Sequence, residues 1–131
     1  MGVSRLRRRW TRRVLSAAAV LAVAAQATGC RKGPSPSGLG DPDRGARLVD
    51  VEACGSCHVI PGHAVGSGLA GPPLAGFARR TIIAGLLPNR PGDLVLWLQR
   101  PQAVAPGNGM PDMGLTPQQA RDIAAYLYTL R

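Results

Sequence analysis

At 131 residues the chain is long enough for one domain with extensions. Aromatic side chains make up only 4% of it, so the core must consist mostly of Leu, Ile, Val and Ala. A domain of this size with such a core would be only marginally stable unless another group filled its interior. The formal net charge of +9 comes mainly from six arginines among the first thirteen residues, and the later cations are scattered without interleaved aromatics. This distribution excludes a basic nucleic-acid-binding surface.

Residues 1–29 have the layout of an export signal. An arginine-rich start precedes an apolar run from about Val14 to Ala25, which is shorter than the ~20 residues needed to span a bilayer. We therefore expect cleavage rather than a permanent anchor helix. Two cleavage sites compete. Residues 25–27 form an ordinary A-x-A site, whereas residues 27–30 (A-T-G-C) resemble the lipobox of bacterial lipoproteins, with alanine where leucine is most frequent.

Cys30 favours the lipoprotein site. The other two cysteines, Cys54 and Cys57, form a C-x-x-C pair and are not available to it, so Cys30 would be an unpaired thiol in an oxidising compartment. Lipidation would account for it. We expect an exported bacterial protein in the periplasm, anchored to the membrane through Cys30, with soluble secretion as the alternative. Residues 30–40, rich in Pro, Gly and Ser, predict a flexible tether before a domain at 41–131.

The domain is expected to begin with a helix. Asp41 is a favourable N-cap and Pro42 suits the first helical position, so the helix should run from there to about Ala53. Gly45 lies inside it, where glycine costs about 1 kcal/mol relative to alanine. Either a second helix crosses at close range there or the glycine is merely tolerated, and the sequence leaves both readings open.

The segment C-G-S-C-H at residues 54–58 follows this helix directly. Two cysteines spaced C-x-x-C and followed by histidine are typical of a c-type haem attachment site. C-x-x-C also occurs in zinc sites and in redox dithiols. A zinc site would need four ligands, and the chain has no second pair of ligands. A redox dithiol would follow a strand, whereas the residues before Cys54 are expected to be helical. We therefore predict one covalent haem, linked to Cys54 and Cys57, with His58 as the proximal iron ligand.

Residues 59–73 are rich in glycine and proline and predict a loop. We expect the Pro72 carbonyl to accept the free ring N–H of His58, which would fix the tautomer and raise the basicity of the imidazole. His63 lies in the same loop. It follows His58 too closely to reach the other face of the ring, so it is expected to face solvent.

Two further helices are expected next. The first covers Phe77 to Leu87 and carries Arg79 and Arg80, either or both of which could pair with haem propionates, since arginine binds carboxylates bidentately. A solvated surface pair is the alternative. The second runs from Pro91 or Gly92 to about Gln99, and its Trp97 is expected to pack on the porphyrin.

Residues 101–114 predict a loop that contains two methionines, Met110 and Met113. A final helix should follow, since Thr116, a proline and Gln119 form a capping box. Apolar residues recur there at i, i+3, i+4 and i+7, which places one apolar stripe on the protein core. They are Ala120, Ile123, Ala124 and Leu127.

Several features together resemble the class I c-type cytochromes, and they cover residues 41–131 in the order found in that family. They are the helix with Gly45, C-x-x-C-H, G-P-x-L at 71–74, an aromatic helix ending at Pro101, P-G-x-x-M at 106–110 and A-Y-L at 125–127. The resemblance implies an all-α fold in which the N- and C-terminal helices cross and shorter helices and loops wrap one covalent haem c.

The resemblance also implies a methionine as the distal iron ligand, on the loop before the last helix. The family pattern M-x-x-x-G-[IL] favours Met110, with Met113 as its rival. Two protein ligands would leave the iron no open position, which implies a one-electron carrier between periplasmic or membrane redox proteins rather than an enzyme. Two alternatives stay open: a haem-bearing accessory subunit of a dehydrogenase or oxidase, or a ligand sensor or peroxidase-like protein if Met110 is labile.

Overall fold

The computed structural model describes residues 38–63, 68 and 70–131. The expected export signal, Cys30 and nearly all of the expected tether lie outside these residues, so they remain expectations from the sequence. In the part of the chain that is described, no helix combines the length and the apolar character that crossing a membrane would require.

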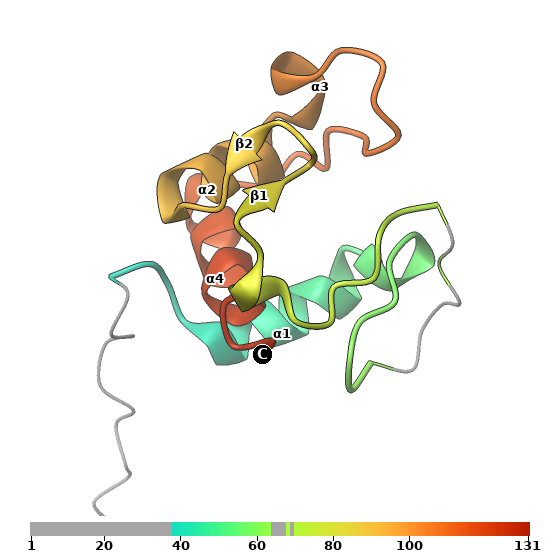
Figure 1. Ribbon diagram of the computed structural model, residues 1–131. Coiled ribbons are helices and arrows are strands. Elements are labelled where there is room, and N and C mark those ends of the chain that lie inside the picture. The colour runs from blue at the N-terminus through green and yellow to red at the C-terminus, as the bar shows by residue number, and fades with distance from the viewer. Residues whose placement is uncertain (1–37, 64–67, 69) are drawn as a thin grey trace, which may run out of the picture. The chain divides into compact units, whose positions relative to one another are not determined.

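The described residues fold mainly as helices, joined by loops and one short hairpin (Figure 1). The α-helices are α1 (Pro42–Val51), α2 (Pro91–Gln99), α3 (Pro101–Val104) and α4 (Pro117–Leu127), with 3-10 turns η1 (Cys54–Ser56) and η2 (Phe77–Arg79) and strands β1 (Ile82–Ile83) and β2 (Leu87–Pro88). The predicted helical fold is therefore confirmed, although α3 replaces the first residues of an expected loop.

Helices α1 and α4 begin where the sequence predicts. The Asp41 side chain accepts hydrogen bonds from the backbone N–H groups of the first turn of α1, and Thr116 and Gln119 form the reciprocal capping box of α4. Helix α1 ends at Val51, two residues before the expected limit, because Ala53 adopts a left-handed conformation with φ of 51°. That reversal sends the chain into η1.

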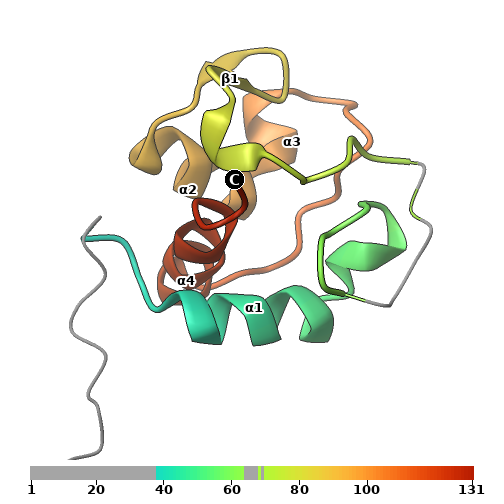
Figure 2. The same cartoon turned by 60° about the horizontal axis from the view of Figure 1, so that its bottom comes forward.

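Helices α1 and α4 cross closely, as Figure 2 shows. At Gly45 a Cβ atom would overlap the Asp122 carbonyl and would lie 2.8 Å from the Tyr126 Cβ. The close-crossing interpretation of Gly45 is therefore confirmed. Across the same contact, Arg44 Nε donates to Asp122 Oδ2 at 2.9 Å, which adds an ion pair whose carboxylate is buried.

Residues 77–87 do not form the expected helix. After η2 the chain turns into an antiparallel hairpin in which Ile82 pairs with Pro88 and Ile83 with Leu87. The turn contains two left-handed residues, Ala84 (φ 52°) and Gly85 (φ 71°), which a helix cannot accommodate. The β-branched isoleucines also favour a strand over a helix.

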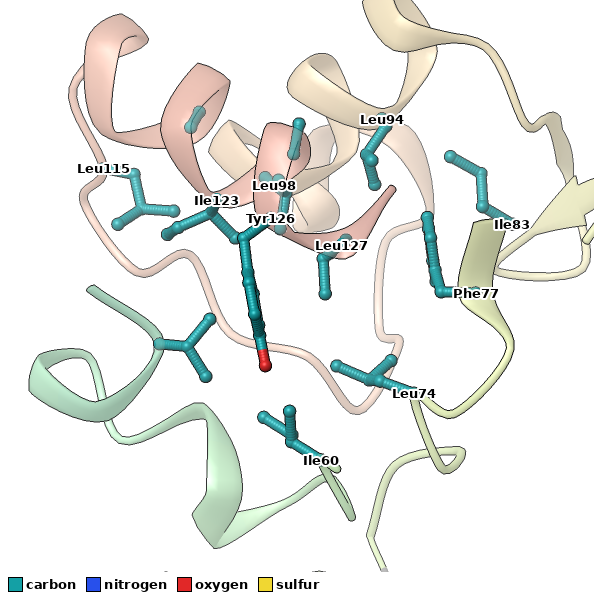
Figure 3. Packing of buried hydrophobic residues seen from close by; sticks show 13 residues of the cluster. Ile60, Leu74, Phe77, Ile83, Leu94, Leu98, Leu115, Ile123, Tyr126 and Leu127 are labelled. Atoms are coloured by element: carbon teal, nitrogen blue, oxygen red, sulfur yellow. The ribbon is translucent and has the colours of Figure 1, made fainter. Parts of the chain in front are cut away.

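The core is aliphatic, with few aromatic side chains, and it lies between α4, α2 and the segments that face them (Figure 3). Its largest fully buried members are Leu94, Ile123, Val49 and Pro101. Phe77 from η2 and Ile83 from β1 complete the side toward the hairpin. Helix α4 contributes the apolar stripe predicted from its sequence, since Ala120, Ile123, Ala124 and Leu127 are all buried.

Candidate functional site

The C-G-S-C-H segment is shaped by tight local hydrogen bonds. The N–H groups of Cys57 and His58 both donate to the Cys54 carbonyl, at 3.3 and 3.0 Å, so the chain turns through a single 3-10 coil. This coil places Cys54, Cys57 and His58 on the wall of one cavity. Both cysteines are free thiols, and burial, followed by the charge of Glu52, raises the pKa of Cys54.

The His58 ring is held from behind by residues 71–72. Its Nδ1 lies 2.8 Å from the Pro72 carbonyl, which can only accept, so Nδ1 carries the proton and Nε2 keeps its lone pair. Gly71 packs directly against the ring: a Cβ there would lie 2.6 Å from Nδ1 and 2.9 Å from Nε2. The Gly71 N–H in turn donates to the Cys57 carbonyl at 2.8 Å. The imidazole is therefore fixed in tautomer and in position, with its basic nitrogen free to bind a metal.

The cavity beside this histidine has a volume of about 420 Å³. Its walls are mostly apolar and come from α1, the hairpin, α2, α4 and the loop before α4; they include Leu74, Phe77, Ile83, Leu94, Leu98 and Leu127. Binding sites for flat apolar ligands have this volume and this kind of lining. Two free thiols and an imidazole on one wall fit the attachment chemistry of a single haem c.

Both candidate methionines line the cavity and are partly buried. The main chain of Met110 is held on both sides: its N–H donates to Asn108 Oδ1 at 2.7 Å and its carbonyl accepts from Gln102 Nε2 at 2.7 Å. Neither Gln102 nor Asn108 was predicted from the sequence to have a role at the site. Their partners are main-chain atoms of the loop, so no pairing of side chains in the sequence could indicate their role. Their positions on either side of Gly107, a turn residue, were the one available indication.

The structure distinguishes the two neighbouring arginines. Arg80 lines the cavity, its guanidinium donates to the Pro73 carbonyl, and it lies 5.3 Å from the centre of the Phe77 ring. Arg79 does not line this cavity; it borders a separate hollow beside Tyr128. Arg80 is therefore the arginine that could meet an acidic substituent of a bound group, and that pairing stays a prediction.

Trp97 also reaches the cavity, from α2. Its side chain is partly buried against the core and lines the cavity together with Leu94 and Leu98 of the same helix. The expectation that Trp97 packs on a bound porphyrin agrees with this position and stays a prediction.

His63 does not face solvent, so that expectation is wrong. Its side chain is 12% exposed, and its ring nitrogens lie 2.6 Å from Asp50 Oδ1 and 2.7 Å from the Tyr126 hydroxyl. The histidine links the loop after η1 to α1 and α4. It is not among the residues that line the cavity.

Two comparisons bear on this arrangement. The family model described as "Cytochrome c" matches residues 42–131, which include the C-G-S-C-H segment, the cavity and both methionines. The chain is also 33% identical over 92 residues to "Cytochrome c oxidase subunit 2" of Alkalihalophilus pseudofirmus. That alignment covers 68% of this chain and 25% of the relative, so the chain spans about a quarter of the length of that protein. The helical fold, the crossing of α1 with α4 and the extent of the match together place this chain in the cytochrome c family.

Proposed function

We propose that this chain is a class I one-electron carrier in which His58 and Met110 would be the two protein ligands of the iron of a single haem c. Membership of the cytochrome c family means that the chain carries one covalent haem c and transfers electrons to and from redox proteins, and that it is not an enzyme. The observation that carries the proposed ligand set is that one cavity is lined by Cys54, Cys57, His58 and Met110.

Each side chain has a separate role in this proposal. Cys54 and Cys57 would hold the haem covalently: addition of each S–H across a vinyl group would form a thioether, which needs no oxidant but requires both thiols to be reduced. His58 presents Nε2, and its Nδ1–H···O=C bond to Pro72 strengthens it as a ligand. When bound, the haem supplies a one-electron iron couple. The Met110 thioether favours the ferrous state and raises the reduction potential relative to more basic ligands.

Met110 is preferred to Met113 as the distal ligand because of its main chain. Met110 is fixed by hydrogen bonds on both its N–H and its carbonyl. A fixed main chain limits the positions that the thioether sulfur samples, which lowers the entropy lost when the sulfur binds iron. Gly109, beside Met110, also lines the cavity.

The test uses the haem-loaded protein and three forms of it: wild type, Met110→Ala and Met113→Ala. We expect Met110→Ala to lose the thioether-to-iron band at the red end of the ferric spectrum and to bind CO rapidly when ferrous. Met113→Ala should keep the band. The opposite pattern would assign the ligand to Met113. Fast CO binding by the wild type would favour the ligand-sensor or peroxidase-like alternative.

A second candidate function is that of a haem-bearing subunit or domain tied to an oxidase. It is supported by the 33% identity to a protein named cytochrome c oxidase subunit 2. The two functions differ in how the protein is found in cells. A mobile carrier should separate from oxidase activity during mild detergent extraction and gel filtration, whereas a subunit should elute with it.

We further propose that the chain is exported and anchored in the periplasm by lipid on Cys30. The support is the sequence alone: the arginine-rich start, the short apolar run and the A-T-G-C segment at residues 27–30. The intact mass of the exported protein tests this directly. A mature chain that begins at Cys30 and carries acyl chains is expected, whereas cleavage after Ala27 would give a soluble protein without acyl mass.

A further inference from the structure

The loop between α2 and α4 is organised by two amide side chains, Gln102 and Asn108. Gln102 Nε2 donates to the carbonyls of Asn108 (2.9 Å) and Met110 (2.7 Å), and its Oε1 accepts from the Gly107 N–H at 3.1 Å. The side chain therefore uses both its donor and its acceptor ends on the main chain of a single loop.

Asn108 completes the set from inside the loop. Its Nδ2 donates to the carbonyls of Pro101 (2.9 Å) and Ala105 (2.7 Å), and its Oδ1 accepts from the Met110 N–H at 2.7 Å. Since Gln102 binds the Asn108 carbonyl as well, the two amides and the loop main chain form a closed group of hydrogen bonds. These two residues and this loop we call the amide clasp.

The amide clasp meets the main chain of Met110 on both sides of its Cα, through the N–H and the carbonyl. Fixing both groups restricts the backbone dihedrals of Met110 and so the direction of its side chain toward the cavity. Between the end of α3 and the start of α4 no helix or strand fixes the main chain. At its tip, Gly107 takes a φ of 78°, and it is Gln102 that holds the Gly107 N–H.

We infer that Gln102 and Asn108 are positioning residues that keep the Met110 thioether in place as an iron ligand, an inference that rests on the ligand set proposed above. An iron–thioether bond competes with water, hydroxide and added ligands. A loop already held in its bound geometry loses little conformational freedom when the sulfur binds, so a stable amide clasp favours the sulfur in that competition. Both residues act on the main chain of Met110.

The inference predicts a specific loss when the amide clasp is broken. Asn108→Ala removes three hydrogen bonds and Gln102→Ala removes three. In the haem-loaded full chain we expect either variant to bind added imidazole in the ferric state about tenfold more tightly than wild type, because the competing thioether is less well held. The thioether-to-iron band should disappear at a lower pH in both variants.

Gln102→Glu gives a closer test of the contact with Met110. It keeps the acceptor for the Gly107 N–H and the shape of the side chain but removes both donors, including the donor to the Met110 carbonyl. It should therefore resemble Gln102→Ala rather than wild type in imidazole affinity. Amide hydrogen exchange at Gly107 should accelerate in Gln102→Ala, which removes its acceptor, but not in Gln102→Glu, which keeps it. Exchange at the Met110 N–H should accelerate in Asn108→Ala.

The control is Gln119→Ala, the same substitution at another glutamine, which removes the Gln119 side-chain half of the α4 capping box and lowers general stability. It should leave imidazole affinity and the band unchanged. If Asn108→Ala and Gln102→Ala bind imidazole as wild type does, or if Gln119→Ala weakens the thioether equally, the inference is wrong. Failure of the proposed ligand set would look different, because Met110→Ala would then keep the band.

Discussion

Gly45 on α1 lies against Tyr126 on α4 so closely that a Cβ on the glycine would be 2.8 Å from the Tyr126 Cβ. The same Cβ would overlap the Asp122 carbonyl, a main-chain atom that cannot rotate away. The spacing of the two helices is therefore set by the absence of a side chain at residue 45.

The crossing predicts that Gly45→Ala destabilises the haem-loaded protein by about 1–3 kcal/mol or more, because the helices must separate to admit the methyl group. The matched control is Gly92→Ala on α2, where a Cβ meets no atom within 4 Å. Guanidinium unfolding followed by far-UV circular dichroism measures both. The expected result for Gly92→Ala is no loss or a small gain, and equal stability of the two variants would contradict this account of the crossing.

The contact between Gly71 and His58 predicts a local effect at the iron. In Gly71→Ala the new Cβ would press on the imidazole, 2.6 Å from Nδ1, and the ring would have to tilt away from its bond to Pro72. We expect a low yield of haem-loaded protein and a high-spin ferric component in the absorption and EPR spectra. Gly92→Ala is again the control, since a Cβ there meets no atom within 4 Å and Gly92 does not line the cavity. A low-spin Gly71→Ala protein made in normal yield would refute the prediction.

The buried carboxylate of Asp122 predicts acid sensitivity. Burial alone would raise its pKa, but hydrogen bonds from Arg44, the Asp41 N–H and Gln118 outweigh burial and hold the pKa of Asp122 below the ordinary 3.8. A carboxylate with a lowered pKa adds stability above its unfolded-state pKa of about 4, and that stability is lost as pH falls toward the folded-state value.

The free energy of unfolding should therefore fall as the pH drops below about 5, and Asp122→Asn should flatten this dependence. At neutral pH the variant should lose about 1–3 kcal/mol, because the Arg44 guanidinium and the Asp41 N–H lose an ionised acceptor. Urea unfolding at a series of pH values measures both effects. Parallel pH curves for Asp122→Asn and wild type would show that this carboxylate is not responsible.

The bridge from Asp50 through His63 to Tyr126 predicts an energetic coupling. His63→Ala and Tyr126→Phe each remove one partner of a hydrogen bond 2.7 Å long. In a double-mutant cycle we expect a coupling free energy of about 0.5–1.5 kcal/mol. Tyr128→Phe serves as the control, because the Tyr128 hydroxyl donates to Asn89 instead. The losses of stability from Tyr128→Phe and His63→Ala should add. If the losses from Tyr126→Phe and His63→Ala also add, the hydrogen bond between His63 and Tyr126 does not contribute to stability.

The features that were predictable from sequence are those decided by neighbours in the chain. Asp41 and Thr116 cap their helices through N–H groups two or three residues away, so their sequence context contains the whole interaction. The C-G-S-C-H segment is similarly local, whereas the hydrogen bond between His58 and Pro72 spans 14 positions. The close crossing at Gly45 was only one of two open readings, because its partner on α4 lies far along the chain.

The errors involve contacts between distant residues. His63 was expected to face solvent because it follows His58 too closely to be a second iron ligand, but its ring hydrogen-bonds to the Tyr126 hydroxyl, 63 positions away. The hairpin after η2 depends partly on Asn89, whose side chain donates to the carbonyls of Phe77 and Arg80 and so closes the segment from its far end. Local propensity does not contain either interaction.

The ion pair between Arg44 and Asp122 joins positions 78 apart in sequence. The C-G-S-C-H segment lies well before α4 in sequence, so α1 gains its packing partner only once the chain has folded as far as α4. Contacts this distant in sequence form late, after a long stretch of chain has been brought together. Both thiols, which are partly buried in the folded chain, are consequently more accessible before α1 and α4 meet.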